Sequence, residues 1–411
     1  MTLASLASEH IGLCVSGGLD SRTVAKRLRE AGVKVTCFTA DLAQPDEPSI
    51  ESVREKMAPC GVDTVIVDLK HEMATESLRL LKAMARYDGG YWNTTGLARA
   101  VTVRGLLGAM QSRGVTVLAH GATGRGNDQV RFERYTNMLA PHMRVYAPWR
   151  DPQLLAEFPG RTQMAHYLDS FGIPAPVGGK KKYSTDANVA GLSHEAEDLE
   201  DLHTPVTIVS PIMGVWPHEA PDIIESVSVS FIKGIPVAIN GEELAALPLL
   251  QRANQIGGRN GIWMKNALEN RIVGTKSRGV YEAPGLEWLG FCLSQLYQAT
   301  LDKRSTALFG QLSQLVSHHI YEGRYYEPST RAAFLGIDEL ARYASGVVSV
   351  GLYKGNMYLH ALHDVGASLY NEADSSMEAS DGLNPISSQG YVDIQRVEAV
   401  ALAKAGQINP F

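Results

Sequence analysis

A short glycine- and hydroxyl-rich segment at residues 16–21 (SGGLDS) carries the most specific chemical signal in the sequence. It lies between an apolar run that predicts a strand and an amphipathic run that predicts a helix. Glycines let backbone N–H groups approach an anion, and the start of a helix adds unpaired donors. Ser16 and Ser21 add hydroxyl groups, whereas Asp20 repels phosphate and fits a role beside Mg²⁺ or as a helix cap. The pattern predicts a phosphate-binding loop.

A second polar segment, residues 120–133 (HGATGRGNDQVRFE), follows another apolar run. Its glycines, amide, carboxylates and arginines are a mixture that no hydrophobic core requires, so a functional loop is expected. Arg131 offers a planar donor fork for a carboxylate, while Asp128 and Glu269 offer negative charge for ammonium groups. These residue types are compatible with a site for an α-amino acid, which needs a carboxylate clamp and an ammonium acceptor, although Glu269 also fits a simple surface pair with Arg271 or Lys276.

Strand and helix patterns alternate through the first half of the chain and must position these segments. Apolar runs at residues 11–15, 33–39, 64–67 and 115–119 predict strands, and the intervening segments predict helices over residues 21–31, 50–60, 72–85 and 97–113. This alternation predicts a parallel sheet with right-handed crossovers, in which ligands bind beyond the carboxyl ends of the strands.

The second half of the chain changes character. Two hairpins are predicted, one from residues 227–231 with 235–239 and one from 347–353 with 356–360, and a long helix is expected over 286–315. We therefore expect an α/β protein with three parts. These are a nucleotide-binding parallel-sheet domain (1–170), an α+β domain (171–365) and a C-terminal arm (366–411) whose helical run packs on the body or crosses to a neighbouring subunit.

Composition narrows the class of protein. Among 411 residues, Lys and Arg number 38 and Asp and Glu 44, which gives a net charge of −6 and argues against a nucleic-acid backbone as the main partner. None of the four cysteines forms a C-x-x-C pair, so a disulfide framework and a zinc ribbon are not expected. The sequence has no run of 18 apolar residues and no signal-peptide pattern, which predicts a cytoplasmic protein without a membrane partner.

The sequence resembles the argininosuccinate synthase family over residues 10 to 395, and its first loop resembles that of the ATP pyrophosphatases. The resemblance rests on ordered segments in addition to the two described above. These are Phe38–Leu42, Leu97–Arg99, Ala147–Arg150, Tyr183–Asn188, Glu269–Arg271 and Lys276–Glu282.

The resemblance implies an ATP-dependent ligation that uses Mg²⁺. The ureido oxygen of citrulline attacks the α-phosphate, which releases pyrophosphate and leaves a citrullyl-adenylate. The amine of aspartate then displaces AMP and gives argininosuccinate. The resemblance also implies a homotetramer in which C-terminal arms embrace neighbouring subunits.

Residue roles follow from the resemblance, position by position. Asp20, Ser21, Asp128 and Arg131 are the expected catalytic residues. The implied nucleotide contacts are Ser16, Gly17, Gly18, Leu19, Asp20, Ser21, Ala40 and Gly121. The implied substrate contacts are Thr95, Thr123, Asn127 and Asp128 for aspartate, and Tyr91, Asn127, Arg131, Ser184, Ser193, Glu269 and Tyr281 for citrulline, with Gly96 at a further substrate position.

Three departures from the family pattern lie near the expected chemistry. Arg22 replaces a small hydroxyl residue and either reaches the pyrophosphate or points to solvent. Ala43 replaces a glycine. Gly96 stands where the family has a serine that contacts citrulline, and its loss removes a hydrogen bond of about 1 kcal/mol. This change is either tolerated or makes room for a different acceptor.

Alternative functions therefore stay open at this point. A specialised paralogue would join aspartate or another amino acid to a different ureido, carbamoyl or carboxyl acceptor. A tRNA-modifying sulfur transferase would need a basic RNA-binding face and a reactive cysteine, which the sequence does not indicate. A non-catalytic nucleotide-binding descendant is disfavoured because both polar loops are intact. The acidic run at residues 195–201 is interpreted as solvated.

Overall fold

The structure is a computed structural model that describes residues 1–124, 126–174, 183–378 and 382–409. Arg125, in the second polar segment, lies outside the described residues. The chain forms two compact units, Met1–Gly366 and Ala367–Phe411, which are described separately below.

A five-stranded parallel sheet forms the first half of the larger unit, as the alternating pattern predicted. The strand order is β3-β2-β1-β4-β5, so the chain reverses direction across the sheet between β1 and β4. In such a sheet the ligand crevice lies outside the carboxyl ends at this reversal. The strands are β1 (His10–Cys14), β2 (Lys34–Asp41), β3 (Asp63–Asp68), β4 (Val117–His120) and β5 (Arg144–Tyr146).

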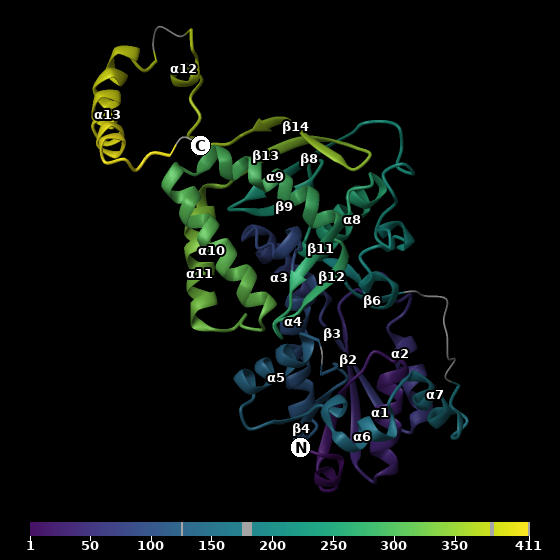
Figure 1. The fold of residues 1–411 in the computed structure, drawn as a ribbon. Helices are drawn as coiled ribbons and strands as arrows, with labels where there is room; N and C mark the ends of the chain where they lie inside the picture. The colour runs from purple at the N-terminus through teal and green to yellow at the C-terminus, as the bar shows by residue number, and fades with distance from the viewer. Residues whose placement is uncertain (125, 175–182, 379–381, 410–411) are drawn as a thin grey trace. The chain divides into compact units, whose positions relative to one another are not determined.

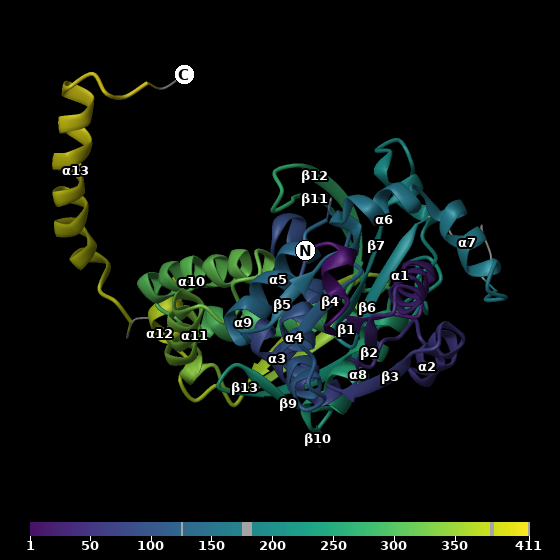
Figure 2. The same ribbon diagram turned by 90° about the horizontal axis from the view of Figure 1, so that it is seen from below.

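Both faces of the sheet are covered by helices, because successive side chains of each strand point to opposite faces. In β4, for example, Val117 and Ala119 pack into one hydrophobic cluster with α1 and α7, while Leu118 packs into the other with α3 and α4. Figures 1 and 2 show these helices around the sheet. The helices of this half are α1 (Leu19–Glu30), α2 (Glu51–Met57), α3 (Lys70–Lys82), α4 (Thr94–Gln111), α5 (Asp128–Leu139), α6 (Pro152–Glu157) and α7 (Arg161–Asp169).

The second half of this unit is α+β and contains two antiparallel sheets. The four-stranded sheet has the order β11-β12-β7-β6, and the five-stranded sheet has the order β10-β9-β8-β13-β14, which includes both predicted hairpins. The strands are β6 (Ser184–Asn188), β7 (Gly191–Glu195), β8 (Glu225–Ile232), β9 (Ile235–Ile239), β10 (Glu242–Glu243), β11 (Met264–Asn270), β12 (Lys276–Glu282), β13 (Gly346–Tyr353) and β14 (Asn356–His363).

The helices of this half correct one prediction. The single helix expected over residues 286–315 is two helices, because Leu301 is extended and the Asp302 carboxylate accepts from the backbone N–H groups of Arg304 and Ser305 and starts a new helix. The helices are α8 (Ala246–Arg259), α9 (Pro284–Thr300), α10 (Lys303–Tyr321) and α11 (Pro328–Leu340).

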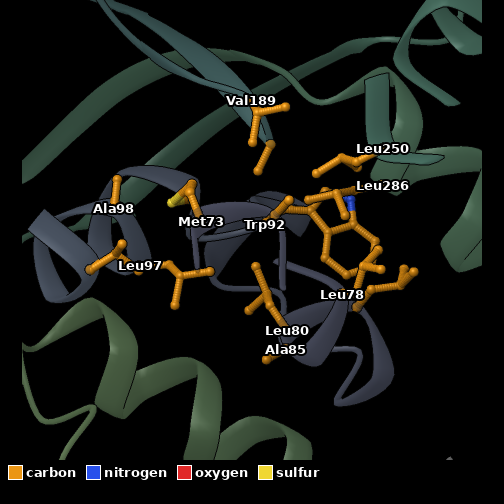
Figure 3. Close-up of a cluster of buried hydrophobic side chains, with 14 of the residues drawn as sticks. Met73, Leu78, Leu80, Ala85, Trp92, Leu97, Ala98, Val189, Leu250 and Leu286 are labelled. Atoms are coloured by element: carbon orange, nitrogen blue, oxygen red, sulfur yellow. The ribbon is translucent and has the colours of Figure 1, made fainter. Parts of the chain in front are cut away.

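One hydrophobic cluster joins the two halves of this unit. Trp92, which precedes α4, packs with Val189, Leu250 and Leu286 from the second half (Figure 3). Its indole N–H donates to the buried carboxylate of Glu287 at 2.9 Å, so the polar edge of this large ring is also satisfied. The halves therefore share a core, and the polar side chains that face each other across this junction are held in fixed positions.

The smaller unit contains α12 (Glu372–Ser375) and α13 (Ser388–Lys404). The structure describes all of α13, and none of its side chains is buried, including Val392, Ile394 and Val397. The predicted helical run at the end of the chain is confirmed. Among the described residues, no helix combines the length and the apolar content that crossing a membrane requires.

Candidate active site

The SGGLDS segment forms the turn between β1 and α1. Gly17 adopts a left-handed conformation (φ 76°) that glycine allows without strain, and Gly18 is the residue that caps α1. The backbone N–H of Ser16 donates to Ser21 Oγ at 3.2 Å and closes the loop. Asp20 lies in the first turn of α1 and is not the cap, and burial raises the pKa of its carboxyl group.

A cavity of about 510 Å³ lies beside this loop at the carboxyl ends of the parallel strands. Its volume is in the range of small-molecule sites. Five of the expected nucleotide contacts line it: Ser16, Asp20, Ser21, Ala40 and Gly121. Three others, Gly17, Gly18 and Leu19, are not among its lining residues, and the side chain of Leu19 is buried in the core beneath the loop. We call this space the nucleotide cavity.

The wall of the nucleotide cavity is strongly acidic. Among the described residues that line it, five are carboxylates (Asp20, Asp46, Glu47, Asp128 and Asp186), while Arg99 is the one guanidinium. A polyphosphate without a cation would be repelled by such a wall. In the described parts of the chain, no group of three or more His, Cys, Asp or Glu residues is arranged to hold a metal ion. This donor set fits a Mg²⁺ ion held mainly by phosphate oxygens and by one carboxylate such as Asp20.

A second cavity, of about 100 Å³, lies next to the first. Eight of the expected substrate contacts line it: Tyr91, Thr95, Asn127, Asp128, Arg131, Ser193, Glu269 and Tyr281. Three others do not line it: Gly96 is buried against Ile320, while Thr123 and Ser184 are exposed. Glu195, Arg271 and Tyr321 also line it and were not predicted. We call this space the acceptor cavity.

The four-stranded sheet presents the floor of the acceptor cavity. In antiparallel strands, directly paired residues lie on the same face. Ser193 pairs with Tyr281, and Glu195 pairs with Gly279, so the β7 and β12 side chains that line the cavity share one face. Glu269 lies on the same face of β11, where its partner across the ladder is Ser277. The strand period thus brings distant carboxyl and hydroxyl groups together.

Asp128 belongs to the walls of both cavities and lies at the centre of an ion-pair network. Its carboxylate accepts from Arg99 Nε and from Arg131 Nη1, each at 2.8 Å, and Arg99 Nη2 donates to Asp186 at 2.5 Å. Burial alone would raise the pKa of Asp128, but the two guanidiniums lower it to about 2. Asp128 is therefore a fixed negative charge between the two cavities at neutral pH.

Glu269 is an inward-facing acceptor and not a surface ion-pair partner. It is 5% exposed, its carboxylate accepts from Tyr281 Oη at 2.8 Å and from Ser277 Oγ at 3.3 Å, and Lys276 instead donates to Asn270. Burial, reinforced by Glu269, raises the pKa of Tyr281, so the phenol remains a donor. The structure therefore favours the binding-site interpretation of Glu269 over the surface pair considered from sequence.

The Tyr281 side chain reaches Glu269 because residue 279 is a glycine. A Cβ atom at position 279 would lie 2.2 Å from Tyr281 Oη, well inside van der Waals contact. The Tyr281 ring lies across the bare backbone of Gly279 and stacks on Tyr91, with ring centroids 3.8 Å apart. Gly279 does not itself line the acceptor cavity, but it leaves the space that the Tyr281 side chain occupies, a role that the sequence motif alone does not identify.

The acidic run after Ser193 needs a correction. Glu195 is not solvated like Glu197 and Asp198: it is half-buried and lines the acceptor cavity, because it lies two residues after Ser193 on the same face of β7. Burial, and then the carboxylates of Asp128, Asp186 and Glu269, raise the pKa of Glu195 to about 7. The strand period was a signal that could have identified it.

The structure also locates the three departures from the family pattern. Arg22 lines neither cavity, and its Nη1 donates to the backbone carbonyl of Pro174 at 2.7 Å. Ala43 has a φ of 54°, the left-handed region in which glycine is unstrained. At Gly96, a Cβ atom would lie 3.0 Å from the carbonyl oxygen of Ile320, so α10 occupies the space that a side chain would need.

The α/β fold, with two adjoining cavities at the carboxyl ends of a parallel sheet, is an arrangement typical of enzymes that bind small molecules. Residues 10–174 match the family model for the arginosuccinate synthase N-terminal HUP domain, and residues 183–402 match that for the arginosuccinate synthase C-terminal domain. The chain belongs to the argininosuccinate synthase family, whose members are AMP-forming ligases of arginine biosynthesis that condense citrulline and aspartate with ATP.

Named relatives agree with the family models over nearly the full chain. The argininosuccinate synthase of Rhodopirellula baltica is 35% identical over 401 residues, which cover 97% of this chain and 98% of the relative. That of Thermotoga petrophila is 35% identical over 410 residues, covering 97% and 99%. That of Desulforamulus reducens is 36% identical over 401 residues, covering 96% and 98%.

Proposed function

We propose that this protein is itself an argininosuccinate synthase. The observation that carries the proposal is that Asp128 lines both the nucleotide cavity and the acceptor cavity, so a group activated in one lies beside the other. The relatives described above all bear this name, which supports this activity over a paralogue that uses a different acceptor.

In the first step, the loop at residues 16–21 and the start of α1 bind the polyphosphate of ATP. Their N–H and hydroxyl donors are fixed before the reaction, so they stabilise the charge that develops on pyrophosphate without reorganisation. Mg²⁺ held by the phosphates and Asp20 would neutralise further charge. Arg131 binds the carboxylate of citrulline, and the acidic floor formed by Glu195 and Glu269 receives its nitrogen groups.

In the second step, aspartate binds beside the nucleotide. Thr95, Thr123, Asn127 and Asp128 are its proposed contacts, with Asp128 accepting from the ammonium group. The ammonium group must lose its proton to solvent, because Asp128 is too weak a base to take it; the amine lone pair then attacks the activated carbon, and AMP leaves with the former ureido oxygen. The fixed orientation of the two substrates lowers the activation free energy of this step relative to the same reaction in solution.

The experiment that tests the proposal measures pyrophosphate release with ATP, Mg²⁺ and aspartate, with citrulline added or withheld. We expect release that depends on citrulline, together with argininosuccinate detected by mass spectrometry. Protein that binds ATP but releases no pyrophosphate with citrulline would instead indicate a different acceptor or a non-catalytic role. A sulfur-transfer role is disfavoured, since Cys37, Cys60 and Cys292 are buried and burial raises the pKa of Cys14 to about 12.

The pKa of Glu195 gives a prediction about pH. A carboxyl group that titrates near 7 is mostly protonated at pH 6 and mostly ionised at pH 8. If the ionised form accepts from the substrate nitrogen groups, the KM for citrulline falls by about tenfold between pH 6 and pH 8. In Glu195→Gln this pH dependence disappears. If the KM for citrulline of the variant depends on pH as it does in the wild type, a group other than Glu195 is responsible for the titration.

The raised pKa of Glu195 also determines how this residue's contribution to folding stability changes with pH. Because the folded-state pKa of Glu195 lies above its ordinary value of 4.5, its contribution is fully present below pH 4.5 and is lost as the pH rises through about 7. The unliganded protein therefore gives up stability at this position at the pH values where the carboxylate is ready to bind substrate.

Gly279→Ala should weaken citrulline binding although it adds only one methyl group. The new Cβ displaces the Tyr281 hydroxyl and breaks its bond to Glu269, so we expect the KM for citrulline to rise about tenfold and the KM for ATP to stay unchanged. Gly108→Ala is the matched control, because a Cβ there meets nothing within 4 Å. Equal citrulline KM values in the two variants would show that the Tyr281–Glu269 bond does not shape the cavity.

We also infer a functional division of the chain and an assembly. Residues 1–170 bind nucleotide, residues 171–365 complete the substrate site, and the arm at 366–411 joins subunits into a cytoplasmic homotetramer. The apolar side chains of α13, none of which is buried, support an arm that is completed by another copy.

A further inference from the structure

The last turn of α10 reaches the acceptor cavity from the second half of the chain. Tyr321 is 1% exposed, lines the cavity, and stacks on Tyr87 with ring centroids 3.8 Å apart. None of the motifs in the sequence contains it. Its backbone carbonyl, ring and hydroxyl each contact a different part of the substrate site.

The first two contacts fix Arg131. The Tyr321 carbonyl accepts from Arg131 Nε at 2.8 Å, and the Tyr321 ring lies 4.9 Å from the guanidinium carbon. Asp128 accepts from Arg131 Nη1, so two sides of the fork are occupied by protein. Within the described residues, Nη2 has no hydrogen-bond partner. Together with the second N–H of Nη1, it remains to donate to a substrate carboxylate.

The third contact fixes Asn127. Its Nδ2 donates to Tyr321 Oη at 2.8 Å, and its Oδ1 accepts from the backbone N–H of Ile272 at 2.9 Å. Both ends of the amide are therefore held, which fixes its orientation and leaves the second Nδ2–H for a ligand. Burial and the nearby Glu269 carboxylate raise the pKa of Tyr321, so its hydroxyl keeps its proton at neutral pH.

The same turn accounts for Gly96. The carbonyl of Ile320, adjacent to Tyr321, occupies the position that a side chain at residue 96 would need. A serine at position 96 would push against the turn that carries Tyr321. In this chain, residue 96 has no hydroxyl group, and α10 packs closely against the backbone at that position instead.

We infer that Tyr321 is a positioning residue of the substrate site. Its hydroxyl sets the Asn127 amide, its carbonyl and ring set the Arg131 guanidinium, and together they hold the groups that orient both amino-acid substrates. This inference rests on the proposed function. It adds a residue from α10 to a site otherwise built from the parallel-sheet loops and the four-stranded sheet.

The test compares Tyr321→Phe with Tyr87→Phe in the full-length protein. The first substitution removes the hydroxyl bound to Asn127 but keeps the ring and the carbonyl. The second removes a hydroxyl from the same ring stack that donates to the Asn270 carbonyl, outside the acceptor cavity. For Tyr321→Phe we expect five- to tenfold higher KM values for citrulline and aspartate, with the KM for ATP within twofold of wild type.

Thermal unfolding separates positioning from a structural role. Similar melting temperatures for the two variants, with the selective KM change in Tyr321→Phe alone, support the inference. Identical kinetics in both variants, or a uniform change in all three KM values with a lower melting temperature, would overturn it. Failure of the wild-type protein to make argininosuccinate would refute the proposed function instead, so the two failures are distinguishable.

Discussion

We expect Arg131→Lys to lower kcat/KM for citrulline by roughly 10²- to 10³-fold, although the positive charge is kept. This corresponds to about 3–4 kcal/mol, within the range for truncating one partner of a buried, hydrogen-bonded charge pair. Arg131 is 4% exposed and bonds simultaneously to Asp128 and to the Tyr321 carbonyl. One ammonium group cannot make both bonds and also present a fork to a substrate carboxylate.

The control for this variant lies on the same helix. Arg134→Lys alters a guanidinium of α5 that pairs with Glu327 away from both cavities. We expect it to change kcat/KM less than twofold. Melting temperature and ATP binding show whether Arg131→Lys is folded. A folded Arg131→Lys protein with wild-type kcat/KM would remove Arg131 from the substrate site.

Asp128→Asn is the second change with a large expected effect. It removes the negative charge that lies between Arg99 and Arg131, and it replaces one of the two accepting oxygens with an NH2 group, so that one guanidinium faces a donor. Two functions fail together, because the ammonium group of aspartate loses its acceptor and Arg131 loses its orientation. We expect kcat/KM for aspartate to fall by roughly 10²- to 10³-fold, measured as argininosuccinate formation at neutral pH.

Glu327→Gln provides a matched comparison. Glu327 also bridges two guanidiniums, those of Arg134 and Arg324, but it lines neither cavity. A bridge of this kind near the surface contributes about 0–1 kcal/mol. If both substitutions reduce activity equally, the effect of Asp128→Asn comes from lost stability and not from the site.

Much of the fold could be predicted because it depends on local patterns. The strands β1 to β4 and the helices between them were each identified within a few residues, since apolar periodicity and glycine punctuation act over short stretches. The break between α9 and α10 was missed because apolar positions recur on both sides of the short polar stretch at residues 302–306. Only the capping role of Asp302 distinguishes the two helices from one.

The site was predicted less completely, for a related reason. Residues in contiguous motifs, such as Ser16, Asp128 and Arg131, could be proposed from sequence because one segment carries several of them. The structure places them at the two cavities, and their roles stay predictions. Glu195 was misjudged, because a run of acidic residues conceals the strand alternation that turns one of them inward. Tyr321 left no local signal, since its role depends on α10 packing against a loop almost 200 positions earlier in the chain.

The contacts that complete the acceptor cavity cross the junction between the two halves of the larger unit. Arg131 and Asn127 come from one half, while Tyr321 and Ile272 come from the other, and their hydrogen bonds are 2.8–2.9 Å long. A displacement of about 1 Å breaks such bonds, whereas apolar contacts such as those of Trp92 keep roughly half or more of their attraction. We therefore expect heat or mild denaturant to inactivate the protein before its sheets unfold.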